Sequence, residues 1–237
     1  MVSIDDALKG QVSGVLIKGQ STLNNTLETK QITNQTTFNF EVLKPYSIAS
    51  GNKDVKIPLQ YLENAATYQY FAFPKVNKSA FLVAKLSNWE KLNLLEGEAN
   101  IYFEDTFIGT SLLDTRTAKE FLEISLGVDK NVVIDRTKEE NFNSKQFIGG
   151  KQEDVRLWNF TIKNNKQQNI NIEIIDQTPI SSNEDIKVEL DTDVTTGIHN
   201  KATGEIKWNL NVAATKTESF KLKYIVKYPK GTTLYFD

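Results

Sequence analysis

Apolar and polar residues alternate one by one along most of this chain, and this period of two constrains its fold more than any other feature. The segment Phe38–Val42 alternates in this way, and Phe220–Tyr228 near the C-terminal end does so strictly. Successive side chains of a β-strand point to opposite faces, so alternation is typical of strands with one buried face. The pattern therefore predicts an all-β protein.

Further segments are predicted as strands, separated by clusters of turn residues. Two of them, 68–73 and 80–84, are apolar on both faces, which is typical of strands in the middle of a sheet. A short helix is expected at Ser3–Lys9, ended by Gly10, and Thr115–Glu120 can add one further turn. The remaining predicted strands are 55–61, 99–104, 106–113, 121–126, 132–135, 155–162, 170–175, 186–190 and 205–210.

Two adjacent glycines in Phe147–Gln152 suggest a boundary between two halves of the chain. We expect a partly mobile N-terminal segment at 1–34, a β-rich domain at 35–148 and a second β domain at 149–237. About seven short strands in roughly 80 residues are typical of an immunoglobulin-like sandwich. The predicted architecture is thus two β-sandwich-like domains, the C-terminal one immunoglobulin-like.

Composition excludes several classes of function. The 28 basic and 30 acidic residues of this 237-residue chain nearly cancel, so no overall field attracts it to nucleic acid or an anionic membrane. The apolar runs are far shorter than the roughly 20 residues that span a bilayer. Cysteine is absent, which excludes disulfides and thiolate metal sites. We expect no nucleic-acid partner and no membrane span in this chain.

The residues that could carry catalysis are few. His199 is the only histidine and lies in the loop 197–204, where we expect a solvated turn residue. Without a second histidine or a cysteine, neither a zinc site nor a cofactor is expected. Paired carboxylates could serve glycoside hydrolysis, yet acidic turns are the simpler interpretation. These pairs are Glu96/Glu98, Glu104/Asp105, Glu139/Glu140 and Asp191/Asp193, of which the last could also offer oxygen ligands to calcium.

Binding motifs are equally weak. Gly149–Lys151 lacks the leading glycine and the following Ser or Thr of a phosphate-binding loop. The lysines of Lys163–Lys166 are expected at a hairpin tip. Trp89, Trp158 and Trp208 could stack on sugars only if they are exposed, and the last two fall in predicted strands where core packing is expected.

Six stretches of the chain are distinctive in sequence: Gly97–Glu104, Phe107–Gly109, Leu113–Asp114, Ser125–Lys130, Phe147–Gly149 and Tyr224–Pro229. They resemble the C-terminal domain of unknown function of the mucoidy-inhibitor-A-like bacterial envelope proteins. The likeness covers most of 38–229. Separately, Ala7–Val15 resembles the short segment that opens the plug of TonB-dependent receptors.

The family resemblance implies a compartment and an architecture. Full-length members look like exported proteins with an N-terminal β domain, a coiled coil and this C-terminal β module. The chain would then be the C-terminal piece, in the periplasm or cell envelope if cut from a longer exported precursor. Its first residues, Met1–Asp6, show no secretion signal, and Met1 is the only methionine. The resemblance supplies no catalytic residues.

We therefore expect a non-enzymatic β module that acts as a scaffold or protein-interaction domain. Its partner would be another protein or other domains of its own precursor. The alternative is a carbohydrate-binding or glycan-processing module, which would need exposed Trp or Tyr beside Asp or Glu. A third hypothesis, an accessory of an outer-membrane receptor, depends on Ala7–Val15 alone.

Overall fold

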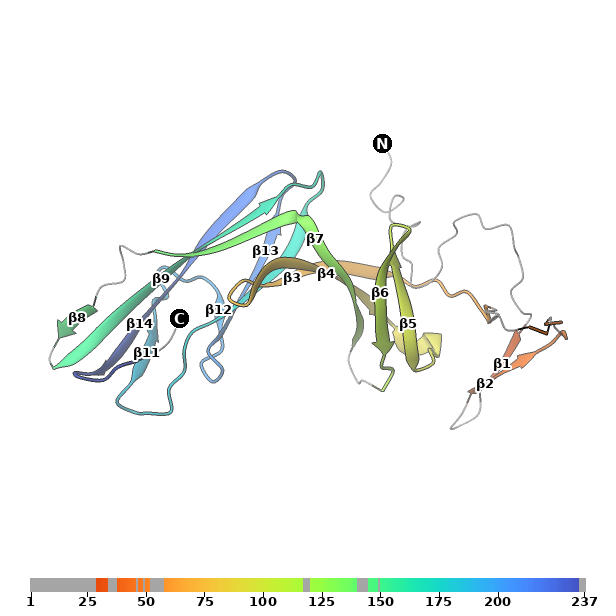
Figure 1. Ribbon diagram of the computed structural model, residues 1–237, viewed down its shortest axis with the longest axis horizontal. Coiled ribbons are helices and arrows are strands. Elements are labelled where there is room, and N and C mark those ends of the chain that lie inside the picture. Colours follow the sequence, from red (N-terminus) through yellow and green to blue (C-terminus); the bar gives the residue numbers. More distant parts are fainter. Residues whose placement is uncertain are drawn as a thin grey trace. The chain divides into compact units, whose positions relative to one another are not determined.

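The computed structural model describes residues 29–33, 38–45, 47–48, 50–51, 58–116, 120–139, 145–148 and 150–234. Nearly every regular element among them is a strand, which confirms the predicted all-β class (Figure 1). The exception is a short 3-10 helix, η1 (Trp89–Leu92). The predicted helix at Ser3–Lys9 and the plug-like segment Ala7–Val15 lie outside the described residues.

The strands follow one another along the chain with short connections. They are β1 (Thr29–Thr33), β2 (Phe38–Val42), β3 (Ala66–Phe73), β4 (Asn77–Ser87), β5 (Gly97–Phe103), β6 (Thr106–Leu113), β7 (Phe121–Lys138), β8 (Lys145–Ile148), β9 (Lys151–Asn164), β10 (Ile170–Gln177), β11 (Lys187–Leu190), β12 (Ile198–His199), β13 (Glu205–Val212) and β14 (Thr217–Pro229).

Most predicted strands are present, and β2 and β6 have the predicted bounds. The expected strands 121–126 and 132–135 are instead one continuous strand, β7. Gly127 lies between them at a φ of 85°, a conformation open to glycine, so the irregularity is absorbed without ending the strand. Of the expected strand 55–61, residues 58–61 are not in a strand and 55–57 lie outside the described residues.

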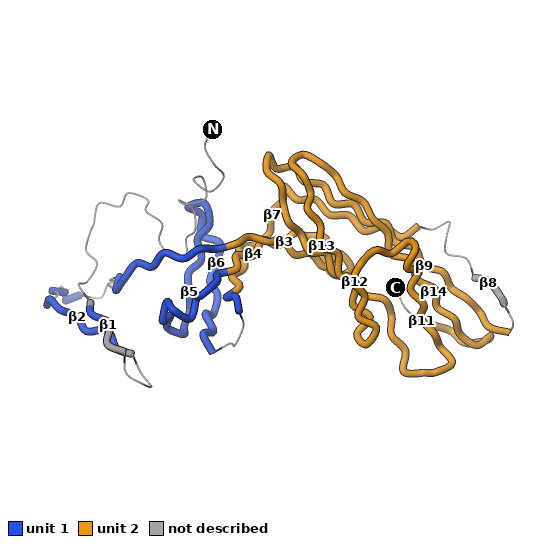
Figure 2. Tube along the Cα trace, turned by 180° about the vertical axis from the view of Figure 1, so that it is seen from behind, with its two compact units in different colours: residues 1–66, 86–122 blue, residues 67–85, 123–237 orange. Residues whose placement is uncertain are grey.

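The chain forms two compact units (Figure 2). The first comprises residues 1–66 and 86–122 and contains two two-stranded sheets, β1–β2 and β5–β6. The second comprises residues 67–85 and 123–237 and contains the large sheet. These units are discontinuous in sequence, since β3 and β4 belong mainly to the second. The division into 1–34, 35–148 and 149–237 stays a prediction.

The large sheet has ten strands in the order β11-β14-β9-β7-β4-β3-β10-β13-β12, with β8 added beside β9. As expected for segments apolar on both faces, β3 and β4 are central. The sheet folds back on itself, as contacts between distant strands show. The ring centroid of Trp208 in β13 lies 5.5 Å from that of Phe160 in β9 and 4.7 Å from that of Phe220 in β14. The second unit therefore contains one folded sheet, and two separate sandwich-like domains are not confirmed.

Alternation along the strands explains why the sheet folds in this way. In β10, Ile170, Ile172 and Ile174 are buried, while Asn171 between them is exposed. The inward side chains of β14 alternate likewise. Strands such as β10 and β14 thus contribute a single apolar face, and the free energy of the fold comes from bringing those faces together. Trp158 and Trp208 lie in this core, as predicted.

Candidate functional site

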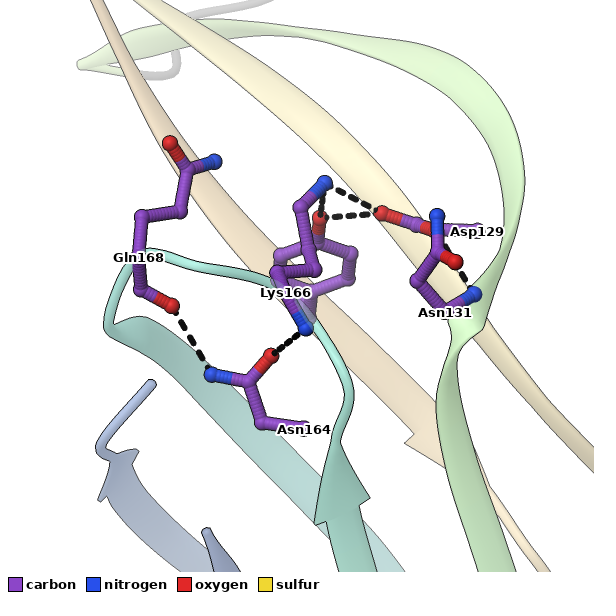
Figure 3. A network of polar contacts seen from close by, with 6 residues as sticks. Asp129, Asn131, Asn164, Lys166 and Gln168 are labelled. Atoms are coloured by element: carbon purple, nitrogen blue, oxygen red, sulfur yellow. Dashed lines mark hydrogen bonds and ion pairs between the residues drawn. The ribbon is translucent and has the colours of Figure 1, made fainter. Parts of the chain in front are cut away.

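A polar network lies where the turn between β9 and β10 meets β3 and β7, and it joins groups far apart in the sequence (Figure 3). The ammonium of Lys166, in the turn, lies 2.6 Å from Oδ2 of Asp129 in β7 and 3.0 Å from the hydroxyl of Tyr70 in β3. That hydroxyl donates to the same carboxylate oxygen at 2.7 Å. All three side chains therefore contact one another.

Asn164, at the end of β9, holds the turn that carries Lys166. Its Nδ2 donates to the carbonyl oxygens of Gln168, Val212 and Ala213, and its Oδ1 accepts the backbone N–H of Lys166 at 3.0 Å. Asn164 is fully buried, so these bonds replace the water that its amide has lost. The position of Lys166 is consequently fixed by the backbone.

The network keeps its members in their ordinary charge states at neutral pH. Burial, followed by the hydrogen bond to Asp129, raises the pKa of Tyr70 to about 12. Burial opposes ionisation of Asp129 and of Lys166, but their mutual hydrogen bond and those with Tyr70 outweigh it. The pKa of Asp129 is therefore lowered and that of Lys166 raised. A tyrosinate base or a neutral lysine nucleophile would need the opposite shifts.

A second pair of charges is buried between the folded halves of the sheet. Arg136 in β7 donates from Nε to Asp176 in β10 at 2.8 Å and from a terminal nitrogen at 3.3 Å. Its guanidinium also lies 3.5 Å from the ring centroid of Trp158. A buried ion pair with this two-point geometry joins elements and fixes their register.

Sequence reasoning missed both groups because their members lie 37 to 96 residues apart. A signal was nevertheless present. Arg136 continues the buried face of Val132 and Ile134, and Asp176 continues that of Ile172 and Ile174. A charged residue in phase with a buried face needs a charged partner, and these two satisfy each other.

The hairpin β5–β6 is the other prominent feature. Its two turn residues, Glu104 and Asp105, have φ values of 48° and 59°, as in a type I′ turn. Tyr102 pairs with Phe107, and Ile101 with Gly109, so Ile108 is the extra residue of a bulge.

The two faces of this hairpin differ. One carries the buried Ile101, with Ala99 and Leu113 partly covered. The other is open: Tyr102 is 41%, Phe107 53% and Leu112 69% exposed. The rings of Tyr102 and Phe107 lie 5.3 Å apart on this open face. Clustered exposed apolar side chains mark interaction surfaces in soluble proteins.

His199 differs from the solvated turn residue that the sequence suggests. It lies in β12, paired with Ile206, and is half-buried; its Nε2 is buried without a hydrogen-bond partner. Burial, and then the charge of Lys201, lowers its pKa. The imidazole is therefore neutral at physiological pH, and its environment is that of a packing residue.

The acidic pairs serve turns and ion pairs. Asp191 accepts the N–H groups of Asp193 and Val194 and contacts Lys223 at 2.7 Å. Glu96 pairs with Arg116 at 3.0 Å. Glu104 and Asp105 form the hairpin turn described above.

Glu139 accepts a hydrogen bond from Asn159 at 2.7 Å, while Glu140 lies outside the described residues. Across the described part of the chain, no group of three or more His, Cys, Asp or Glu residues could hold a metal ion.

The remaining motifs have structural roles or lie at the surface. Lys163 is exposed in β9, whereas Lys166 belongs to the polar network. Gly150 is in a turn, and Gly149 lies outside the described residues. All three tryptophans are buried, so they form no exposed platform for sugars. Within the described ranges, no helix is long and apolar enough to cross a bilayer.

The fold and the polar networks together define an all-β module in which the charged side chains of both networks form ion pairs. The chain belongs to the family described as a domain of unknown function, DUF4139, whose model matches residues 17–230. This confirms the predicted domain of unknown function.

One curated relative is Protein F37C4.5 of Caenorhabditis elegans, 21% identical over 210 residues. The match covers 84% of this chain and 38% of that protein, so the chain spans well under half of the relative's length. No solved structure matches the chain.

Proposed function

We propose that this chain is a non-catalytic β module that acts as a scaffold or protein-interaction domain. The observation that carries the proposal is the open face of β5–β6, which exposes the adjacent rings of Tyr102 and Phe107 and, beyond the polar pair Asn100 and Thr110, the side chain of Leu112. Burying such a face against a partner is worth roughly 25 cal/mol per Å² of apolar area. A surface of this kind gains free energy from a protein partner.

The polar networks support the non-catalytic part of the proposal. Asp129, Lys166 and Tyr70 engage one another, and Arg136 engages Asp176. The pKa shifts of the first three hold them in the forms that are inert at neutral pH. Groups that neutralise one another in this way stabilise a fold and leave no acid or base poised near pH 7.

Photo-crosslinking tests this proposal. A photoreactive amino acid replaces, one at a time, the exposed Val76, Leu112 and Ile198 in the full chain inside living cells. We expect discrete protein adducts at one or more of these positions, because an interaction module is occupied in the cell. Absence of adducts at all three positions would overturn the interaction role. A glycan array run in parallel distinguishes the carbohydrate-binding alternative.

We further propose that the module works in a bacterial cell envelope. The likeness of stretches such as Gly97–Glu104 and Tyr224–Pro229 to mucoidy-inhibitor-A-like proteins supports this location. The nematode relative shows that the sequence type also occurs in an animal. Cell fractionation of the native gene product tests the compartment: recovery in the cytosolic fraction would contradict it.

A further inference from the structure

We propose that the free edge of β6 accepts an extended strand from a protein partner whose apolar centre is flanked by basic residues. This inference rests on the proposed interaction function and specifies the chemistry of the partner. Three features of the hairpin β5–β6 carry it: a strand edge without charge or proline, an open face with exposed apolar side chains, and a strongly acidic surround.

As far as the structure describes the chain, the edge of β6 has one of the devices that normally protect an edge, a bulge, and lacks charged residues and proline. Among the described residues, β6 pairs with β5 and with no other strand. Its eight residues, Thr106–Leu113, include no charged residue and no proline. Natural sheets block an exposed edge with lysine, proline, bulges or a covering element. Here the bulge at Ile108 lies near one end, which leaves Gly109–Leu113 as a regular edge.

The open face determines what the added strand must present. Side chains of neighbouring strands align across a sheet, so an added strand would place alternate residues beside Thr110 and Leu112. Leu112 is 69% exposed, and the rings of Tyr102 and Phe107 continue the same face. Backbone hydrogen bonds give affinity in strand addition, and side-chain contacts give selectivity. The centre of the partner strand should therefore be apolar.

The acidic charges around the hairpin favour basic residues at both ends of the partner strand and disfavour binding of a second copy of this chain. Residues 95–116 contain five acidic residues and one basic residue, a net charge of −4. The single basic residue, Arg116, already pairs with Glu96 at 3.0 Å and Asp114 at 3.2 Å. Two copies of this hairpin would repel each other, whereas lysine or arginine flanks would be attracted. The acidic residues are Glu96, Glu98, Glu104, Asp105 and Asp114.

Two synthetic peptides with the full chain test the inference. Both have the same alternating valine–threonine centre; one carries two lysines at each end and the other two glutamates. We expect the lysine peptide to bind at least tenfold more tightly at low salt, and to slow amide hydrogen exchange at 106–113. Its affinity should fall as salt is added. Equal binding of both peptides would overturn the assignment of the partner's charge.

Matched variants locate the site. Leu112→Lys should weaken lysine-peptide binding at least tenfold, while Ile198→Lys, at a residue with a similar 72% exposure in the other unit, should leave it unchanged. Replacing Glu98, Glu104 and Asp105 by their amides should remove the preference for the lysine peptide.

The remaining outcomes separate this inference from the proposed function. The lysine peptide could slow amide hydrogen exchange only in the second unit, or nowhere although crosslinked adducts still form in cells. Either outcome would overturn the assignment of the binding site to the β6 edge and leave the proposed interaction role intact. Sedimentation that shows a dimer of the unmodified chain, lost in Leu112→Lys, overturns the inference in favour of a second copy.

Discussion

Tyr70 donates a hydrogen bond to Asp129 and accepts one from Lys166, although Tyr70 itself lies in the core. Removing its hydroxyl takes one partner from each of two charged groups that are largely shielded from water. Tyr70→Phe should lower the free energy of unfolding by about 1–2 kcal/mol at pH 7. Urea denaturation followed by circular dichroism measures the change. Tyr102→Phe, at an exposed tyrosine, is the control and should lower the free energy of unfolding by less than about 0.5 kcal/mol. An equal decrease in both variants would contradict a structural role for the network.

The same network predicts loss of stability in alkali. The folded state holds the Tyr70 proton up to a pKa of about 12, whereas the unfolded chain releases it near 10. The folded state therefore binds more protons between these values, and stability falls as pH rises through this window. The raised pKa of Lys166 acts in the same direction. Unfolding free energies measured from pH 9 to 12 should converge for the unmodified chain and Tyr70→Phe. Parallel curves would show that Tyr70 does not contribute.

The buried ion pair of Arg136 and Asp176 makes a different prediction. Arg136→Met leaves a buried carboxylate without a countercharge and should cost about 3–5 kcal/mol. The double variant Arg136→Met/Asp176→Leu removes both charges and should recover most of that loss. Chemical denaturation of the four species of this cycle measures the coupling. Additive losses would mean that the two charges do not depend on each other.

At the scale of elements, the β5–β6 turn is strained by its own sequence. Glu104 and Asp105 both adopt positive φ, which residues with a Cβ disfavour. Asp105→Gly should therefore stabilise the hairpin by about 0.5–1 kcal/mol and slow amide exchange in β6. In the β3–β4 turn Lys75 has no positive φ, so Lys75→Gly should bring no gain. Faster exchange in Asp105→Gly would contradict the turn geometry.

Elements were more predictable than their arrangement. Period-two alternation located β2, β10 and β14, because a half-buried strand imposes that pattern locally. It could not show that β3 pairs in parallel with β10, whose paired residues Tyr70 and Ile172 lie far apart in the chain. The fold-back of the large sheet depends on such long-range pairings.

Among the candidate site residues, too, those in locally patterned strands were predictable and those that depend on long-range contacts were not. Burial of Trp158 and Trp208 followed from their strands. The network of Tyr70, Asp129 and Lys166 could not be predicted from a local sequence motif, because each residue comes from a different element. The prediction of His199 as a turn residue is wrong, because a strand of two residues is too short to show an alternating pattern.

In the molecule as a whole, the groups that stabilise the fold differ from the surfaces proposed to contact a partner. Charged groups of the second unit are paired with one another, as in Arg136–Asp176 and Lys166–Asp129. Exposed apolar side chains occur in both units, and those of the hairpin β5–β6 are among them. The proposed partner is another protein or other domains of the chain's own precursor. The crosslinking scan covers both kinds of partner.

The most direct measurement is the yield of crosslinked adduct in the variant Asp129→Asn/Lys166→Met, which removes both charges of the network. Circular dichroism on the same protein establishes the folded fraction. We expect an adduct yield per folded molecule within about twofold of the unmodified chain, since the proposed binding depends on exposed apolar surfaces. A fully folded variant that forms no adduct would contradict it, because the network would then take part in function.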